Sequence, residues 1–158
     1  MANFEEAVRL TLQHEGGYVN NLHDSGGPTK YGITQKDMPG ISIKDITPAD
    51  ATKYYADRYW KPLYSQINSQ GLANKLFDAG VLFGVGTAVK MLQISMANKI
   101  AVVSDGVFGQ NTLDAVNQSQ EDLLPGYRAT LIQHCINIVN HKPEDGVFVN
   151  GWINRINS

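Results

Sequence analysis

Two acidic residues near the start of the chain, Glu15 and Asp24, occupy settings that suit acid–base chemistry. Glu15 is expected on the apolar side of an amphipathic run, where burial disfavours a carboxylate and raises its pKa. The partial negative charge at the carboxyl end of a helix acts in the same direction. Asp24 lies in a polar, glycine-rich loop, where an acid stays ionised. One protonated and one ionised carboxyl are what glycoside hydrolysis requires.

This chemistry gives each residue a role. Glu15 would protonate the leaving oxygen, and Asp24 would activate water or stabilise or capture the oxocarbenium-like centre. The hydroxyl of Thr29, shortly after Asp24, would help to hold such a water. The sequence does not give the distance between the two carboxyls, so inverting and retaining outcomes both stay open. The alternative reading of Glu15 is an ordinary acid at a helix end that points outward.

A helix must position Glu15, and the residues before it predict one over 4–15. The members of its apolar face recur at steps of three and four along the chain. Asn3 and Glu6 have the spacing of an N-cap and its reciprocal partner. Gly16 and Gly17 then end the helix. The face comprises Phe4, Val8, Thr11, Leu12 and Glu15.

The rest of the chain predicts a mainly α protein with a small β-hairpin within residues 18–34. Pro48 begins a second helix, which Lys61-Pro62 ends. Ser119 and Asp122 form a cap-like pair before a long helix, with Pro125 in its first turn. Further helices are expected over 70–83, 87–99, 111–117 and a tail that carries Trp152 and Ile156. We therefore expect one domain over 1–158, with a catalytic segment over 1–70 and a helical segment over about 71–158 in the same core.

Composition narrows the classes of function. The chain has 158 residues, 42% of them hydrophobic, which suffices for one core, and a net charge of −2, which gives no reason to expect nucleic acid as a partner. Cys135 is the single cysteine, so an internal disulfide and a cysteine zinc site are excluded, and we expect a buried small side chain. His14 and His23 lack the H-E-x-x-H spacing, and no phosphate-binding glycine motif occurs. We predict neither a metal nor a cofactor.

The first residues do not resemble a signal peptide, because MANFEEAVRLTLQ carries acids and lacks a continuous apolar core. No window approaches the roughly 20 apolar residues of a membrane-spanning helix. We therefore expect a protein made in the cytoplasm without an integral membrane segment, and we assume that it is a monomer.

The segment from His14 to Thr34 resembles the signature of glycoside hydrolase family 108, phage and prophage muramidases of the lysozyme superfamily. It reads H-E-G-G-Y-V-N from His14 and D-S-G-G-P-T-K-Y-G-I-T from Asp24. The spacing of the Glu, Asp and Thr is also similar to the catalytic triad of phage-type lysozymes, in which the gap from Asp to Thr is usually one residue longer.

The likeness extends over nearly the whole chain. One departure concerns Leu82-Phe83-Gly84, where family members commonly have Asn-x-Gly, so any substrate contact made by that Asn is in doubt here. The segment around 105–116 resembles the family's C-terminal peptidoglycan-associated part. The other matching stretches are Tyr59-Trp60, Leu76-Phe77-Asp78, Ala88-Val89, Leu92-Gln93 and 151–155.

The resemblance implies a single lysozyme-like α-helical domain that hydrolyses the β-1,4 bond between N-acetylmuramic acid and N-acetylglucosamine in bacterial peptidoglycan. By the same resemblance Glu15 is the general acid, with Asp24 and Thr29 as its water-handling or electrostatic partners. The further implied cleft residues are Tyr18, Asn20 and Tyr31. It also implies an endolysin that reaches the wall, in the periplasm, through a holin-like pore or cell rupture.

Two rival functions stay open. A lytic transglycosylase needs one acid and no water and leaves a 1,6-anhydro sugar, so Asp24 and Thr29 argue against it. The other rival is a non-catalytic wall-binding or secretion-associated protein. A Glu15→Gln variant separates this rival from an enzyme. If the variant still binds walls but no longer lyses them, the protein is an enzyme.

Overall fold

The computed structural model describes residues 1–15, 28–97 and 100–158, and of Glu15 only the backbone. Within these ranges the chain forms seven α-helices, three short 3-10 helices and one antiparallel hairpin. The prediction of a mainly α fold with a small hairpin after the first helix is confirmed. The elements are α1 (Phe4–Glu15), β1 (Thr29–Lys30), β2 (Ile33–Thr34), η1 (Ile43–Asp45), α2 (Pro48–Tyr59), η2 (Pro62–Gln66), α3 (Gln70–Phe83), α4 (Val85–Met96), α5 (Gln110–Gln118), α6 (Leu124–His141), η3 (Pro143–Phe148) and α7 (Val149–Asn157).

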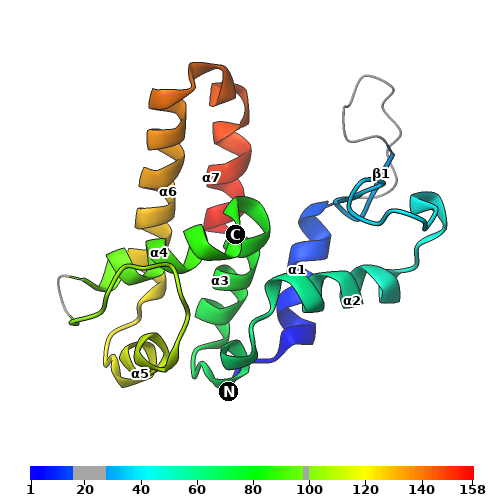
Figure 1. Cartoon of the computed structure of the whole chain (residues 1–158). Coiled ribbons are helices and arrows are strands. Elements are labelled where there is room, and N and C mark those ends of the chain that lie inside the picture. Colours follow the sequence, from blue (N-terminus) through cyan, green and yellow to red (C-terminus); the bar gives the residue numbers. More distant parts are fainter. Residues whose placement is uncertain (16–27, 98–99) are drawn as a thin grey trace.

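Helix α3 is the centre of the molecule (Figure 1). It packs against α1 and α2 on one side and against α4 and α6 on the other, while α7 pairs with α6. Most of its side chains are buried, including two charged ones, Lys75 and Asp78. A helix that is buried on most faces in this way holds together the elements on both of its sides.

Two apolar clusters lie on the two sides of α3. The smaller one joins α1, the hairpin, η1 and α2, and α3 contributes Phe77 to it. The larger one joins α3 with α4, α5, α6 and α7, and includes Leu76, Leu92, Leu131 and Cys135. Cys135 is fully buried as predicted, and burial raises the pKa of its thiol to about 11, so it stays protonated at neutral pH.

The start of α1 follows the sequence prediction in part. Asn3 caps the helix, because its Oδ1 accepts hydrogen bonds from the backbone N–H groups of Glu5 at 2.7 Å and Glu6 at 3.4 Å. The predicted reciprocal bond from Glu6 is wrong. The backbone N–H of Asn3 donates to Oε1 of Gln70 at 2.7 Å, and a carboxylate oxygen of Glu6 accepts from Asn74 instead. The cap therefore fastens α1 to the start of α3.

Two predicted helix starts also need correction. The helix expected over 87–99 begins at Val85, because Gly84 has a φ of 88° and turns the chain sharply between α3 and α4. Ser119 and Asp122 do not cap α6 as a pair. Ser119 bonds to the backbone of Glu121, and Asp122 accepts from the backbone N–H of Leu124, the first residue of the helix.

A buried glutamine organises the loop before α5. Gln93 is 1% exposed, and its Nε2 lies 3.0 to 3.1 Å from Oδ1 of Asp105, the carbonyl of Val107 and the hydroxyl of Thr112. Its Oε1 accepts from the backbone N–H of Gly106 at 2.8 Å. All its polar atoms are therefore satisfied, and α4, the loop and α5 are held as one unit.

No helix in the described part of the chain is both long and apolar enough to cross a membrane.

Candidate active site

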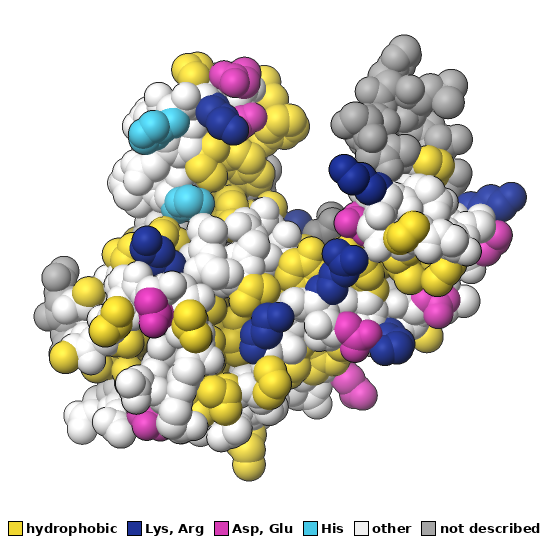
Figure 2. Space-filling model, in the orientation of Figure 1, with side chains coloured by type: hydrophobic (Ala, Val, Ile, Leu, Met, Phe, Trp, Pro, Cys, Tyr) yellow, Lys and Arg dark blue, Asp and Glu magenta, His cyan; other side chains and the backbone are white. Residues whose placement is uncertain are grey.

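The surface is hollowed between the α6–α7 pair and the lobe that carries the β1–β2 hairpin (Figure 2). Helix α1 ends beside that lobe, as Figure 1 shows. Glu15 is the last residue of α1, as predicted. Its backbone therefore lies next to the lobe that carries the hairpin. Concave surfaces of this kind are where ligand-binding sites usually lie.

The hairpin next to α1 has an unusual turn. Thr29 pairs with Thr34 and Lys30 with Ile33, which leaves Tyr31 and Gly32 at the tip. Both have positive φ, 54° for Tyr31 and 74° for Gly32, as a type I′ turn requires. A tyrosine in this region is strained by about 1–2 kcal/mol, and such strain persists only where neighbouring contacts hold it.

Hydrogen bonds to α2 and η1 hold the hairpin, and three of them join described residues. The hydroxyl of Tyr55, on α2, donates to the carbonyl oxygen of Tyr31 at 2.8 Å. Lys30 Nζ donates to the carbonyl oxygens of Lys44 at 2.8 Å and Ile46 at 2.9 Å. These bonds tie the turn to α2 and to the η1 segment, so the half-buried Thr29 and Tyr31 have fixed positions on a rigid support.

A buried ionic network connects α1, α3 and α7. Asp78 is 7% exposed, and both of its oxygens accept from Arg155, at 2.9 Å from Nη2 and 3.1 to 3.2 Å from Nε. The hydroxyl of Thr11 donates to the same carboxylate at 3.1 Å. Lys75 Nζ donates to the carbonyl oxygen of Arg155 at 2.7 Å and lies 3.8 Å from Asp78.

This network holds α1, the helix that carries the predicted acid, against α3 and α7. Thr11 is fully buried and lies one helical turn before Glu15 on the same face of α1. Its bond to Asp78 sets how the last turn of α1 lies against α3, and Arg155 extends that restraint to α7. The carboxyl end of the chain therefore helps to position the helix that carries the predicted acid.

A tyrosine-lined pocket of about 200 Å³ lies beneath the hairpin tip, between α2 and the end of α3. Burial raises the pKa of Tyr54 in this pocket to about 12, with nearby Tyr59 and Asp37 adding to the effect, so its hydroxyl stays a donor at neutral pH. Phenolic groups around a small polar pocket suit hydrogen bonding to sugar hydroxyls. Leu82, at the position where the resemblance leads us to expect an Asn, also lines this pocket, and so supplies an apolar wall where an amide would offer a hydrogen bond.

The aromatic run over 54–64 divides between two roles. Tyr55 and Tyr64 are buried in the two clusters and pack against other aromatic rings there. Tyr54 and Tyr59 are half-buried and line the tyrosine pocket. Core packing therefore explains one part of this run, and the other part faces a pocket.

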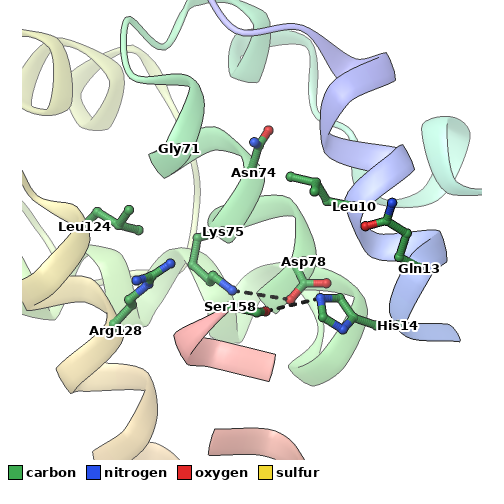
Figure 3. Close-up of a pocket in the computed structure, with 10 residues that line it drawn as sticks. All are labelled: Leu10, Gln13, His14, Gly71, Asn74, Lys75, Asp78, Leu124, Arg128 and Ser158. Atoms are coloured by element: carbon green, nitrogen blue, oxygen red, sulfur yellow. Dashed lines mark hydrogen bonds and ion pairs between the residues drawn. The ribbon is translucent and has the colours of Figure 1, made fainter. Parts of the chain in front are cut away.

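A second pocket, of about 230 Å³, opens between α1, α3 and the start of α6 (Figure 3). Its charged lining residues are Lys75, Asp78 and Arg128, and His14 closes one end with its Nε2 3.2 Å from the hydroxyl of Ser158. The other lining residues are Leu10, Gln13, Gly71, Asn74 and Leu124.

Of the six predicted site residues, the structure places two. Thr29 and Tyr31 lie in the hairpin, at the start of β1 and at the turn. The side chain of Glu15, together with Tyr18, Asn20 and Asp24, lies outside the described residues. The catalytic and cleft roles of all six therefore stay predictions. No group of histidine, cysteine or acidic side chains suited to a metal ion occurs among the described residues.

Sequence reasoning missed the ionic network and the second pocket. Asp78 and Arg155 had been singled out only as parts of matching motifs, and Arg128 not at all. One usable indication existed: Lys75 and Asp78 interrupt an otherwise apolar helix, and charges in such a place are usually paired. Their partners are about 80 residues away, on α7, and neither helical periodicity nor spacing identifies them.

Two family profiles match the chain side by side. Residues 8–84 match the family described as glycosyl hydrolase 108, and residues 87–157 match a predicted peptidoglycan domain. The fold is similar to the structure of Brucella abortus SagA, with a TM-score of 0.76 and 28% sequence identity over 98% of this chain and 89% of that chain. A comparison with curated proteins gave no match. The pair formed by Asp78 and Arg155 joins the two matched regions.

Proposed function

Because the chain belongs to the glycosyl hydrolase 108 family, we propose that it is an N-acetylmuramidase that cleaves the β-1,4 bond between N-acetylmuramic acid and N-acetylglucosamine. Membership makes it a glycoside hydrolase, and the second matched profile makes peptidoglycan its substrate class. The choice of bond and the residue roles are the proposed part.

The observation that carries the proposal is the adjacency of the two matches. A glycosidase profile over residues 8–84 is followed directly by a peptidoglycan profile over 87–157, and both regions share the packing around α3. These shared contacts support a hydrolase in which the region matched by the peptidoglycan profile packs directly against the region matched by the glycosidase profile.

In the proposed mechanism Glu15 protonates the glycosidic oxygen as it leaves. Asp24 and Thr29 handle the water or stabilise the positive charge that develops on the sugar. The position of Thr29 supports its part, because the hairpin holds it at the lobe to which α1 delivers residue 15. Tyr18, Asn20 and Tyr31 are proposed to contact the glycan.

The test is the chemistry of the new chain ends. Purified peptidoglycan is digested with the protein, and the soluble fragments are analysed by mass spectrometry with and without borohydride reduction. We expect fragments that end in a reducible muramic acid. Reducible N-acetylglucosamine ends would mean that the other glycosidic bond is cut, and they would contradict the proposed specificity.

The same fragments decide between the rival functions. Fragments with 1,6-anhydro-muramic ends would mean a lytic transglycosylase, which needs no water and so leaves Asp24 and Thr29 without the proposed roles. Wall binding without release of fragments would mean a non-catalytic protein. Free peptides would mean cleavage of an amide bond and would overturn the glycosidase assignment.

We further propose an endolysin role, in which a monomer made in the cytoplasm reaches the wall through a holin-type pore or after rupture. Support for this part comes from the family resemblance alone. Expression in a bacterial host with and without a separate pore-forming protein tests it: we expect lysis only when the pore is present. Lysis at the same rate without the pore would contradict the delivery route.

A further inference from the structure

We propose that the pocket between α1, α3 and α6 binds a carboxylate of the peptide stems that peptidoglycan carries, with Arg128 and Lys75 as the anion-binding residues. This inference rests on the proposed function, since it names a second part of the same substrate. It adds a peptide subsite to an enzyme whose chemistry concerns the sugar.

The first observation is an arginine that has no partner among the described residues. Arg128 lines the pocket and is only partly exposed, and its Nε is buried with no hydrogen-bond partner. No residue in the described ranges forms an ion pair with it. A guanidinium normally satisfies its donors with carboxylate, phosphate or backbone oxygens, and a buried donor left unmet costs about 1–3 kcal/mol. A ligand that brings a carboxylate would remove that cost.

The second observation is the charge around the pocket. Among the described residues, the charged side chains of the lining are Lys75, Arg128 and Asp78, and Arg155 of α7 already engages both oxygens of the Asp78 carboxylate. Burial lowers the pKa of Lys75; Asp78 opposes this effect, while Arg128 and Arg155 add to it. Among the described residues, the lining of the pocket therefore carries two cations, Lys75 and Arg128, against the one carboxylate of Asp78, which favours an anionic ligand.

The rest of the lining fits a peptide better than a simple ion. The side-chain amides of Gln13 and Asn74 can bond to peptide N–H and carbonyl groups, and Leu10 and Leu124 offer apolar contacts. Leu124 and Arg128 lie in the first two turns of α6, an 18-residue helix. The partial positive charge at the N-terminus of a helix favours binding of an anion nearby. Carboxylate, amide and alkyl groups together are the composition of a short acidic peptide.

The position of the pocket fits the geometry of the polymer. His14 closes one end of it and directly precedes Glu15 in the chain. The peptide stems are attached to the muramic acid residue, one of the two sugars whose bond is proposed to be cut. A stem on a glycan bound near the end of α1 would therefore begin close to this end of the pocket.

The test compares two substrates, whole peptidoglycan and the same glycan after its peptides are removed with an amidase. The change is Arg128→Gln, and the control is Arg9→Gln, because Arg9 is an exposed arginine of α1 outside this pocket. We expect the wild type to prefer the peptide-bearing glycan in kcat/KM. In Arg128→Gln that preference should fall about tenfold, mainly through KM, as expected for one charge-assisted hydrogen bond. Arg9→Gln should keep the wild-type preference, and an unchanged preference in Arg128→Gln would overturn the inference.

Folding is controlled by the same pair of variants. Since Arg128 has no described partner and lies among cations, Arg128→Gln should melt at or above the wild-type temperature. A lower melting temperature would assign Arg128 a structural role and overturn the argument from its lack of a partner. Arg128→Lys keeps the charge without the planar fork and should show an intermediate preference.

A binding experiment separates failure of the subsite from failure of the proposed function. The full chain is titrated with L-alanyl-D-glutamate and with inorganic phosphate at matched ionic strength, followed by NMR. We expect the dipeptide to bind the wild type and Arg9→Gln, and to bind Arg128→Gln about tenfold more weakly. If phosphate binds and the dipeptide does not, the pocket is a site for a free anion. If neither binds, the pocket is not a subsite. Either result overturns the peptide assignment. If the dipeptide binds but no glycan is cut, only the proposed function fails.

Discussion

The hydroxyl of Thr11 donates a 3.1 Å hydrogen bond to Oδ1 of Asp78, inside the contact between α1 and α3. Asp78 in turn accepts a two-point interaction from Arg155. Because Thr11 lies one turn before Glu15, the three residues form a continuous link from the last helix to the end of the first. The region matched by the peptidoglycan profile therefore supports the helix of the glycosidase region and is not merely attached to it.

Asp78→Asn should destabilise the protein strongly. An amide cannot neutralise Arg155 and Lys75, and breaking a buried ion pair by removing one charge costs about 3–5 kcal/mol. The free energy of unfolding is measured by denaturant titration. Asp57→Asn is the control, because its pair with Lys53 is exposed on both sides and is worth about 0.3–0.5 kcal/mol. Equal losses in the two variants would show that the network contributes no more than a surface pair.

Tyr55→Phe should loosen the hairpin that carries Thr29. The variant loses the bond to the carbonyl oxygen of Tyr31, worth about 0.5–1.5 kcal/mol, at a turn that is already strained. Amide hydrogen exchange at residues 29–34 should become faster than in the wild type. Tyr64→Phe is the control: its hydroxyl is buried without a hydrogen-bond partner in the described structure, so removing it should leave stability unchanged or raise it. The account is contradicted if both variants exchange alike.

Gly106→Ala should destabilise the loop before α5. Its φ is +77°, and an added Cβ would lie 2.7 Å from the carbonyl oxygen of Gly86, so both backbone strain and a clash result. We expect a loss of at least about 1–2 kcal/mol in thermal or chemical unfolding. Gly126→Ala is the matched control, since that site lies in α6 with open space around the added Cβ and should gain about 0.5–1 kcal/mol. A loss in both variants would argue against a special requirement at Gly106.

Binding of L-alanyl-D-glutamate should weaken as the pH rises toward the ordinary pKa of lysine. The pKa of Lys75 is lowered, so in the folded protein its charge is lost at a lower pH than in a free lysine. The groups facing it are Asp78 on α3, Arg128 on α6, Arg155 on α7 and His14 on α1. A titration from about pH 8 to about pH 10.5 lies above the ordinary range of histidine.

The matched variant in that titration is Lys75→Met, which should bind weakly at every pH and show no such dependence. Binding by the wild type should decline but not vanish, because Arg128 keeps its charge throughout. A wild-type affinity that stays constant up to about pH 10.5 would remove Lys75 from the proposed site.

The helices were predictable because their causes are local. The apolar spacing of residues 4–15, the capping box of Thr47 with Asp50 and the breaks at glycine all act within a few residues. The hairpin was predictable in kind, since glycine and polar residues gather in 18–34. Its tyrosine at positive φ was not, because the strain is held by Tyr55 of another element.

The features that local patterns failed to predict depend on distant partners. Glu6 has the spacing of a capping-box partner for Asn3. The backbone N–H of Asn3 nevertheless donates to Gln70, which tertiary packing places next to Asn3. The pairing of Asp78 with Arg155, and the lack of a partner for Arg128 among the described residues, depend on how α6 and α7 pack against α3. The family signature covers the predicted catalytic residues. The sequence therefore indicates the chemistry more fully than it indicates the residues that hold the predicted catalytic helix and hairpin in place.

The most direct test of the account is the activity of Glu15→Gln on purified peptidoglycan, measured as release of reducible muramic acid ends. Glu5→Gln is the control, an equal loss of charge in the first turn of the same helix. We predict wild-type release for Glu5→Gln and, for Glu15→Gln, the loss of nearly all release with wall binding and melting temperature retained. Release by Glu15→Gln at the wild-type rate would contradict the assignment of Glu15 as the acid.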